Sequence, residues 1–312
     1  MNKRVYGIIG IASIMSNWNA DFSGYPKTIS DGRTFGSDKA LKYPMKKMWE
    51  NEGKKVLYIK SMRFSEKKGE ISMVPNSLSE RYEKLFGELD KKEKDSKKVL
   101  TNLLTAVDVK NFGATFAEQG NNIAITGAVQ IGQGFNEYEE TEAQVQQILS
   151  PFRDGSKDSN EDGEAKNSSL GSKIVSDEAH YFYPFAINPM AYKELVELGV
   201  TEGYTQEDYD NFKRTSLVCA TSYATNAKEG CENEFAVFVE TQQDCYLPNL
   251  TNYLTFTKTE EENVISLNCG GVLKELGEQI LSVEIYYNPD TTKLEHNIQG
   301  AKVYHIVTKK EV

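Results

Sequence analysis

The chain has 312 residues, of which 39% are hydrophobic and 26% charged, so it can bury a substantial core and has the composition of a folded, soluble protein. Its net charge of −10 argues against a general nucleic-acid coat, because proteins that bind duplexes are usually basic overall. No stretch approaches the roughly 20 apolar residues needed to cross a bilayer, so no membrane partner is expected.

The charge is distributed unevenly along the sequence. Residues 39–68 hold ten Lys or Arg against three acidic residues, a local net charge of +7. Residues 154–178 hold seven acidic residues against three Lys, a local net charge of −4. An acidic protein with one basic face can still bind a polyanion on that face. The overall charge therefore leaves a nucleic-acid role open.

The first residues permit two interpretations. Residues 1–4 and the apolar run that follows are similar to the basic and apolar regions of a signal peptide. However, Val5, Gly7 and Ile9 alternate with their neighbours as in a buried strand, and no small-x-small cleavage site follows cleanly. We predict a central strand at residues 4–13 and a cytoplasmic protein.

A long polar loop is predicted at residues 17–36, and it is too long for an ordinary connection, which indicates a functional role. The helix that follows has Ser37 as its expected N-cap. It carries Lys39, Lys42 and Lys46 at spacings of three and four, which places three ammonium groups on one face. Such a face suits a phosphate backbone, although a merely solvated helix face is the alternative.

Pro44 lies within this predicted helix. Because proline lacks a backbone N–H and its ring contacts the preceding turn, we expect a kink or a break there.

The remaining elements are predicted from periodicity and turn signals. Strands are expected at residues 55–61, 108–117, 122–131, 180–188, 234–241, 282–287 and near 302–308, with a hairpin turn at 118–121. Helices are expected from residue 79 into the low 90s and at residues 100–107, 189–199 and 204–225. Residues 135–153 are amphipathic without a clear type, and residues 91–98 and 154–173 are predicted to be mobile because they hold almost no apolar side chains.

The order of these elements is the outline of a ferredoxin-like domain of the RNA-recognition-motif (RRM) type. We predict an α+β fold, a modified RRM/ferredoxin-like palm with an antiparallel sheet, forming one domain over residues 1–312. Three insertions are expected, at residues 17–36, at 62–105 as a helical block, and at 154–173.

Several motifs that suggest enzymes lack their necessary context. Residues 177–180 spell the DEAH helicase box, but no phosphate-binding G-x-x-x-x-G-K-[ST] loop precedes them. Gly132 and Gly134 are a fragment of a dinucleotide fingerprint without its third glycine. Four cysteines and three histidines are dispersed and propose neither a metal site nor a nucleophile–base pair, so we expect reduced thiols, no metal and no cofactor.

Asp21, Asp31 and Asp38 are close in sequence and could hold a metal ion for phosphodiester cleavage. More often such residues form Asx turns and helix caps. This alternative remains open at the level of the sequence.

Five motifs in series carry a resemblance to a known family. They are Asn17-x-Asn19-x-Asp21, Ser37-Asp38-x-x-Leu41-Lys42, Asp108-Val-x-x-Phe112-Gly113-Ala114, Thr126-Gly127-x-Val129-Gln130 and Ser169-Leu170-Gly171-Ser172-Lys173. In this order and spacing the chain resembles, over about residues 4–240, the crRNA-binding backbone subunit of the Cascade complex, the seventh Cas protein family within the RAMP superfamily. The type I-B subfamily is the most similar.

The resemblance implies a hand-shaped molecule with an RRM-like palm, a finger-like insertion at residues 62–105 and a thumb loop at 154–173. Several copies would line up head to tail in a helical filament along one crRNA and grip its backbone, so that the bases pair with target DNA in antiviral defence. The implied subunit is non-catalytic. Its implied partners are crRNA, other copies of itself, the repeat-handle-binding, large and small Cascade subunits, and target DNA by way of the crRNA.

The resemblance also implies a set of RNA-contacting residues, in which the amides at the start of the first helix would favour phosphate. The set comprises Asn17, Asn19 and Lys27 in the loop, Ser37, Lys39, Lys42 and Lys46 at the first helix, Gln130 on a palm strand, and Arg153, Ser169 and Lys173 in the thumb. This chain departs from some relatives in having Asp38 and Pro44 where they have Lys or Arg, and in having an acidic thumb.

Two other functions remain as alternatives. A type III-like backbone subunit would cleave target RNA with a metal ion held by Asp21 or Asp31. A DNA-binding regulator would prefer specific duplex DNA, but no recognition helix supports that function.

Overall fold

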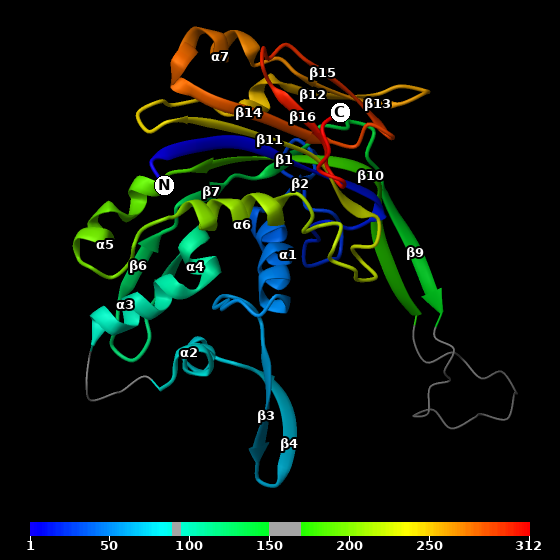
Figure 1. Cartoon of the computed structure of the whole chain (residues 1–312). Coiled ribbons are helices and arrows are strands. Elements are labelled where there is room, and N and C mark those ends of the chain that lie inside the picture. Colours follow the sequence, from blue (N-terminus) through cyan, green and yellow to red (C-terminus); the bar gives the residue numbers. More distant parts are fainter. Residues whose placement is uncertain (89–94, 150–169) are drawn as a thin grey trace, which may run out of the picture.

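The computed structural model describes residues 1–88, 95–149 and 170–312, and its largest element is one mixed β-sheet (Figure 1). Its strands are β1 (Lys3–Ser16), β2 (Phe35–Gly36), β7 (Val129–Ile131), β8 (Gly134–Asn136), β9 (Ala143–Leu149), β10 (Leu170–Ile187), β11 (Cys231–Gln242), β14 (Ile280–Tyr287) and β16 (Lys302–His305). Their order is β16-β14-β11-β1-β10-β8-β2, with β7 and β9 also paired to β10. The predicted α+β class is confirmed. The predicted antiparallel sheet is wrong in one pair, because β14 and β16 run parallel.

Strand β1 is the centre of this sheet, paired antiparallel with β10 on one side and β11 on the other. Ile8 and Ile9, which lie on its two faces, are fully buried, as expected for a strand covered from both sides. Gly7 is required here, because a Cβ atom would lie 2.0 Å from the carbonyl oxygen of Val237 and 2.5 Å from the ring of Phe185. The predicted strand at residues 4–13 is confirmed.

Two layers cover the two faces of the large sheet (Figure 1). A helical layer packs one face and buries Trp49, Leu103 and Phe212 in a cluster with Ile9 of β1. It contains α1 (Asp38–Asn51), α2 (Leu78–Phe86), α3 (Ser96–Thr105), α4 (Val107–Phe112), α5 (Lys193–Glu197) and α6 (Gln206–Ser216). The second layer forms a separate cluster with Ile8. It contains α7 (Gly270–Leu276) and a small sheet of β12 (Leu254–Lys258), β13 (Asn263–Leu267) and β15 (Thr292–His296).

Helix α1 begins at the predicted N-cap, since the side chain of Ser37 accepts a hydrogen bond from the N–H of Ala40. The helix continues through Pro44 to Asn51, so the predicted break is wrong. Pro44 is buried in the same face as Leu41, which packs on the core. Burial of this apolar face compensates for the backbone hydrogen bond that proline cannot donate.

The predicted strand at residues 55–61 is absent from the described residues, which have an irregular backbone there. The reason is the side chain of Asp108. Its two oxygens accept hydrogen bonds from the N–H groups of Leu57 and Tyr58, each at 2.8 Å, and thereby replace a strand partner. Correspondingly, the predicted strand at residues 108–117 begins as helix α4, and only its end forms β5 (Gly113–Phe116).

Strand β5 pairs with β6 (Ile123–Thr126) through the predicted turn at residues 118–121, so this hairpin is confirmed. The predicted strand at 122–131 is divided between β6 and β7.

The block at residues 62–105 is not entirely helical as predicted. It starts with a two-stranded hairpin, β3 (Met62–Lys67) and β4 (Glu70–Pro75), which extends away from the large sheet beyond the end of α1 (Figure 1). Helix α2 has a capping box at Ser77 and ends before Gly87, whose φ of 90° suits glycine, so the expected extension into the low 90s is wrong. Helix α3 starts at Ser96, within the stretch predicted to be mobile.

The later predictions are largely confirmed. The strands at 180–188, 234–241, 282–287 and 302–308 are β10, β11, β14 and β16, and residues 189–199 hold a 3-10 turn, Pro189–Tyr192, followed by α5. The helix predicted at 204–225 is shorter, and residues 135–153 contain β8 and β9. Of the predicted mobile segment at 154–173, residues 154–169 lie outside the described ranges and the last four begin β10. Over the parts of the chain that the structure covers, no helix is long and apolar enough to cross a membrane.

Candidate nucleic-acid interface

Helix α1 presents Lys39, Lys42 and Lys46 on one side, but in three different environments. Lys39 is exposed and forms no hydrogen bond or ion pair with any residue that the structure describes. The Nζ atom of Lys42 lies 2.9 Å from a carboxylate oxygen of Asp38 one turn earlier. The Nζ atom of Lys46 donates to the carbonyl oxygen of Tyr58 at 3.1 Å. Lys39 is thus the cation most available to a ligand.

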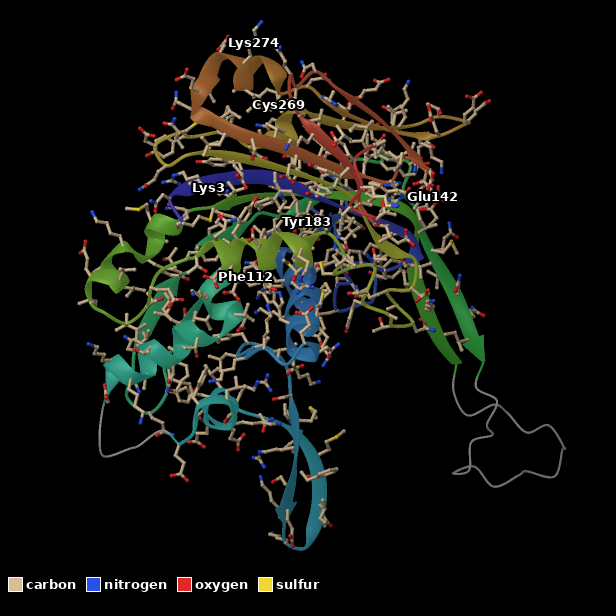
Figure 2. All side chains as sticks on the ribbon, in the orientation of Figure 1. Lys3, Phe112, Glu142, Tyr183, Cys269 and Lys274 are labelled. Carbon is tan, nitrogen blue, oxygen red and sulfur yellow. The ribbon has the colours of Figure 1, made fainter. Side chains whose placement is uncertain are left out.

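These lysines form one wall of an open hollow of about 720 Å³. The opposite wall is Tyr58 together with the segment 112–115, where α4 passes into β5. Phe112 lies at the end of α4 beside α1 (Figure 2), with its ring centroid 5.0 Å from the Nζ atom of Lys42. The hollow therefore combines ammonium groups with aromatic rings, which are the two chemistries that bind single-stranded nucleic acid.

The charge of this wall is balanced by two carboxylates. Asp108 is fully buried, and its Oδ2 atom lies 3.8 Å from the Nζ atom of Lys46. Burial is the largest influence on the pKa of the Lys46 ammonium group and lowers it. The negative charge of Asp108 raises this pKa, and the positive charge of Lys42 lowers it further. Three cations on one face would repel one another, and the carboxylates of Asp38 and Asp108 reduce that repulsion.

The start of α1 is fixed by the preceding loop. The hydroxyl of Ser37 donates to the side-chain oxygen of Asn19 at 2.6 Å, and the same oxygen accepts the N–H of Ser37 at 3.0 Å. Asn19 is only 8% exposed. The asparagine thus holds the first turn of the helix in place next to Lys39, and the amides at this helix end favour an anion.

Asn17 is also buried, at 6% exposure. Its amide nitrogen donates to the carbonyl oxygens of Gly24, at 2.8 Å, and of Ile174, at 3.1 Å. These bonds tie the loop to β10. The side chains of Asn17 and Asn19 therefore face the protein and shape the loop, while their predicted contacts with RNA stay predictions.

The other predicted contact residues do not all gather at the hollow beside α1. Lys27 is half-buried in the loop, where its backbone pairs with Asn19 and Phe35. Lys173 is half-buried on β10, opposite Gln146 of β9. Gln130 is exposed on β7 and lines a different hollow, beside Tyr6 and Pro184. Arg153 and Ser169 lie outside the described residues.

The loop aspartates have the geometry of turn residues. One oxygen of Asp21 accepts the N–H groups of Ser23, at 2.8 Å, and Tyr25, at 3.0 Å, and one oxygen of Asp31 accepts the N–H of Arg33 at 2.9 Å. Among the residues in the described ranges, no group of three His, Cys, Asp or Glu could hold a metal ion. The interpretation as Asx turns is thus supported by each of these bonds. The four cysteines are free thiols, and all four are buried.

Sequence reasoning missed Lys228, which supports the loop from beneath. Its Nζ atom donates to the carbonyl oxygens of Asn17, at 2.6 Å, and Trp18. Burial lowers the pKa of this lysine. Nothing in the sequence around residue 228 marks the contact, because the two segments are 211 residues apart. Asp108 and Phe112 were in a recognised motif, but their roles beside α1 depend on a helix that the pattern did not predict.

Comparison with known proteins gives a family match. The model of the family described as CRISPR-associated protein Cas7 matches residues 3–268. Among solved structures, the chain is similar to one titled "CRISPR RNA-guided surveillance complex, pre-nicking", with a TM-score of 0.55 and 15% identity over 95% of this chain and 96% of that chain. A chain titled "CRISPR RNA-guided surveillance complex" gives a TM-score of 0.49 and 15% identity over 93% of this chain and 94% of that chain. No curated protein sequence gives a significant match.

Proposed function

Because this chain belongs to the CRISPR-associated protein Cas7 family, we propose that it is a crRNA-binding backbone subunit of a CRISPR surveillance complex. The proposed complex is of type I, subtype I-B, and acts in the cytoplasm in antiviral defence. Copies of the chain oligomerise along the crRNA spacer and present it to target DNA, beside the repeat-handle-binding, large and small subunits. The single observation that carries this function is the lysine-lined hollow at the start of α1.

The hand-like organisation predicted from the sequence belongs to this proposal. The large sheet with α1 is the RRM-like palm, residues 62–105 are the fingers, residues 154–173 are the thumb, and all belong to one domain over 1–312. The family match supports the palm. The subtype rests on the motif series around Ser37 and Asp108 in the sequence.

The hollow suits an RNA backbone for three reasons. Lys39 is exposed and can meet a phosphate without losing a protein partner. Lys42 can exchange its carboxylate partner, Asp38, for a phosphate oxygen with its position on the helix unchanged. The first turn of α1 adds backbone amides and the positive end of the helix dipole. None of these groups reads a base, as expected where base pairing supplies the sequence specificity.

The proposed subunit does not cleave RNA. If it were a metal-dependent ribonuclease of the type III kind, Asp21 or Asp31 would hold the metal, and their turn hydrogen bonds would have to give way. The purified assembly with a complementary RNA and Mg²⁺ is expected to leave that RNA intact. Cleavage that disappears when both aspartates are changed to alanine would replace the present proposal with the nuclease.

Matched variants of α1 test the RNA contact. Replacing Lys39 and Lys42 together with alanine is expected to weaken crRNA binding at least tenfold, about 1.4 kcal/mol, because two cations next to the phosphates are lost. Lys47→Ala is the control for each single replacement, Lys39→Ala and Lys42→Ala, since it removes one positive charge from the same helix but from a lysine paired with Glu50 outside the hollow. Equal losses in the control and in these single variants would contradict the assignment of the hollow.

A second measurement tests the function independently of these residues. The protein is purified from cells that carry its own CRISPR locus, and the RNA bound to it is sequenced. Discrete repeat–spacer RNA in a large assembly is the expected result. A monomer without RNA, from cells shown to make crRNA, would contradict the proposed function.

A further inference from the structure

The lysine wall of the hollow beside α1 contains a carboxylate. Asp38 lines this hollow together with Lys39 and Lys42, and its side chain is 27% exposed. The Nζ atom of Lys42 donates a hydrogen bond to its Oδ2 atom at 2.9 Å. Over the described ranges, Lys42 is the only donor to this side chain. The Oδ1 atom of Asp38 therefore keeps its lone pairs available to a ligand in the hollow.

The structure of α1 does not by itself explain this carboxylate. Ser37 already caps the helix, because its hydroxyl accepts the N–H of Ala40. Asp108, the other carboxylate beside these lysines, is fully buried and accepts two backbone N–H groups, so its hydrogen-bonding capacity is used within the fold. Asp38 has no such internal role, and its negative charge lies where a phosphate is proposed to bind.

A phosphate that binds at this wall changes the environment of Asp38. When Lys42 exchanges its carboxylate partner for a phosphate oxygen, Asp38 loses the hydrogen bond that it accepts from Lys42. A partly buried carboxylate without a partner is unfavourable, and it also repels the phosphate. A ligand that carries a hydrogen-bond donor next to its phosphate removes the first of these costs.

The RNA backbone has such a donor, and the DNA backbone does not. Each ribose carries a 2′-hydroxyl between two consecutive phosphates, and this hydroxyl can donate a hydrogen bond. The phosphates and deoxyriboses of DNA offer only acceptors to a carboxylate. Amino groups of the bases are also donors, but contact with them would depend on the sequence, and in the proposed function the bases pair with target DNA. The 2′-hydroxyl is therefore the donor that matches Asp38.

We propose that Asp38 makes the hollow beside α1 selective for RNA over DNA. Its carboxylate accepts a hydrogen bond from a ribose 2′-hydroxyl, while Lys39 and Lys42 bind the adjacent phosphates. With DNA, the same carboxylate gains no donor in place of Lys42 and only repels the backbone. The inference rests on the proposed function, for which it names the residue that distinguishes the two kinds of nucleic acid.

Chemically matched oligonucleotides test the contact with the 2′-hydroxyl. The unaltered protein is titrated with a fluorescent RNA that holds a single copy, with the same sequence carrying 2′-fluoro in place of each 2′-hydroxyl, and with the same sequence as DNA. Fluorine cannot donate a hydrogen bond, so the 2′-fluoro strand lacks the donor but keeps the phosphates. EDTA is present, so that no metal ion joins the carboxylate to a phosphate. The RNA is expected to bind about tenfold more tightly, or more, than either other strand, because a hydrogen bond to a charged group contributes at least that much.

Two variants of Asp38 assign the selectivity to this residue. Asp38→Ala removes the acceptor, so the affinities for RNA and for the 2′-fluoro strand should come within about twofold of each other. Asp38→Asn keeps one neutral acceptor oxygen and should give an intermediate ratio, because hydrogen bonds to neutral acceptors are weaker. Asp31→Asn is the control, since it removes a negative charge from an exposed turn residue outside the hollow and should leave the ratio unchanged.

The outcomes of these titrations are distinct. Equal affinity of the unaltered protein for RNA and for the 2′-fluoro strand would overturn the inference and leave the proposed function in place. A preference for RNA that is unchanged in Asp38→Ala would also overturn it, because a residue that only positions Lys42 alters both affinities equally. Failure of the unaltered protein to bind the RNA would instead contradict the proposed function itself.

Discussion

Asp108→Asn is the substitution whose effect follows most directly from the structure. The Asp108 side chain is fully buried, accepts the N–H groups of Leu57 and Tyr58 at 2.8 Å each, and lies 3.8 Å from the ammonium group of Lys46. An asparagine of the same shape has one acceptor oxygen, so it can keep one of the two amide bonds but not both. The second carboxylate oxygen is replaced by an NH₂ group, which is a donor and cannot accept the remaining backbone N–H.

The expected cost is about 1.5–3 kcal/mol in the free energy of unfolding, which is the typical value for one hydrogen bond to a charged group. Asp108→Ala should cost more, about 3–5 kcal/mol, because it leaves both amide N–H groups without an acceptor, whereas both substitutions remove the carboxylate partner of the Lys46 cation. Both variants should weaken crRNA binding as well, since Tyr58 and Lys46 line the hollow beside α1.

Urea denaturation followed by circular dichroism measures the change in unfolding free energy. The control is Asp31→Asn, the same chemical change at an exposed residue whose side chain accepts a single N–H, from Arg33. The control should remain within about 0.5 kcal/mol of the unaltered protein, as is usual for surface substitutions. A loss below about 0.5 kcal/mol for Asp108→Asn would refute the view that this carboxylate organises residues 55–61.

Two further predictions concern salt and pH. The logarithm of the crRNA binding constant should fall linearly with the logarithm of salt concentration. Replacing Lys39 and Lys42 with alanine should reduce the steepness of that line by about 1.4, or about 0.7 for each phosphate no longer neutralised. An unchanged slope in fluorescence titrations would contradict both contacts. Burial is the largest influence on His180 and would lower its pKa, but the carboxylates of Glu234 and Glu178 together raise it. The stability from this imidazolium is therefore complete below the unfolded pKa of about 6.5 and is lost as pH rises through the higher folded-state pKa. His180→Gln should accordingly flatten the decline in urea midpoint that begins as pH rises above about 6.5.

The sequence predicted the elements whose patterns are complete within a short window. Strand β1 is a short apolar run buried continuously over residues 7–11. The N-cap of α1 depends on a serine three residues before the amide that donates to it. Residues 181–187 of β10 and 235–239 of β11 are continuous apolar and aromatic runs, so the strand type of these parts follows from composition. These features do not depend on distant parts of the chain.

The errors occur where distant residues determine the local structure. Residues 55–61 are rich in apolar and β-branched side chains, yet they have no strand partner because Asp108, 50 residues away from Tyr58, satisfies their amides. Pro44 does not break α1 because the packing of the helix on the core outweighs one missing hydrogen bond. The parallel pairing of β14 with β16 likewise depends on a connection that the sequence pattern does not specify.

The candidate site was predicted in part for the same reason. The three lysines of α1 follow from helical spacing alone, and the structure places them on one wall of a hollow. The opposite wall comes from Tyr58 and Phe112, whose positions require the α4 helix and the carboxylate of Asp108. Sequence spacing can therefore predict which residues share a helix face, but not what faces them across a hollow.

The carboxylates beside these lysines have a consequence for how RNA would be held. Without RNA, the Asp38 carboxylate holds the ammonium group of Lys42 at 2.9 Å on the surface of α1. A phosphate that binds must displace this carboxylate, and the repulsion between the two anions reduces the net affinity of each contact. In the proposed assembly, weak contacts repeated from copy to copy would let each copy release and rebind until its register along the RNA is correct. The total affinity would then come from many linked contacts rather than from any one of them. Asp38→Asn should accordingly strengthen the binding of a single copy to a short RNA, since the amide holds Lys42 less strongly and does not repel phosphate. Weaker binding by this variant in the same fluorescence titration would show instead that Asp38 is needed to position the lysine.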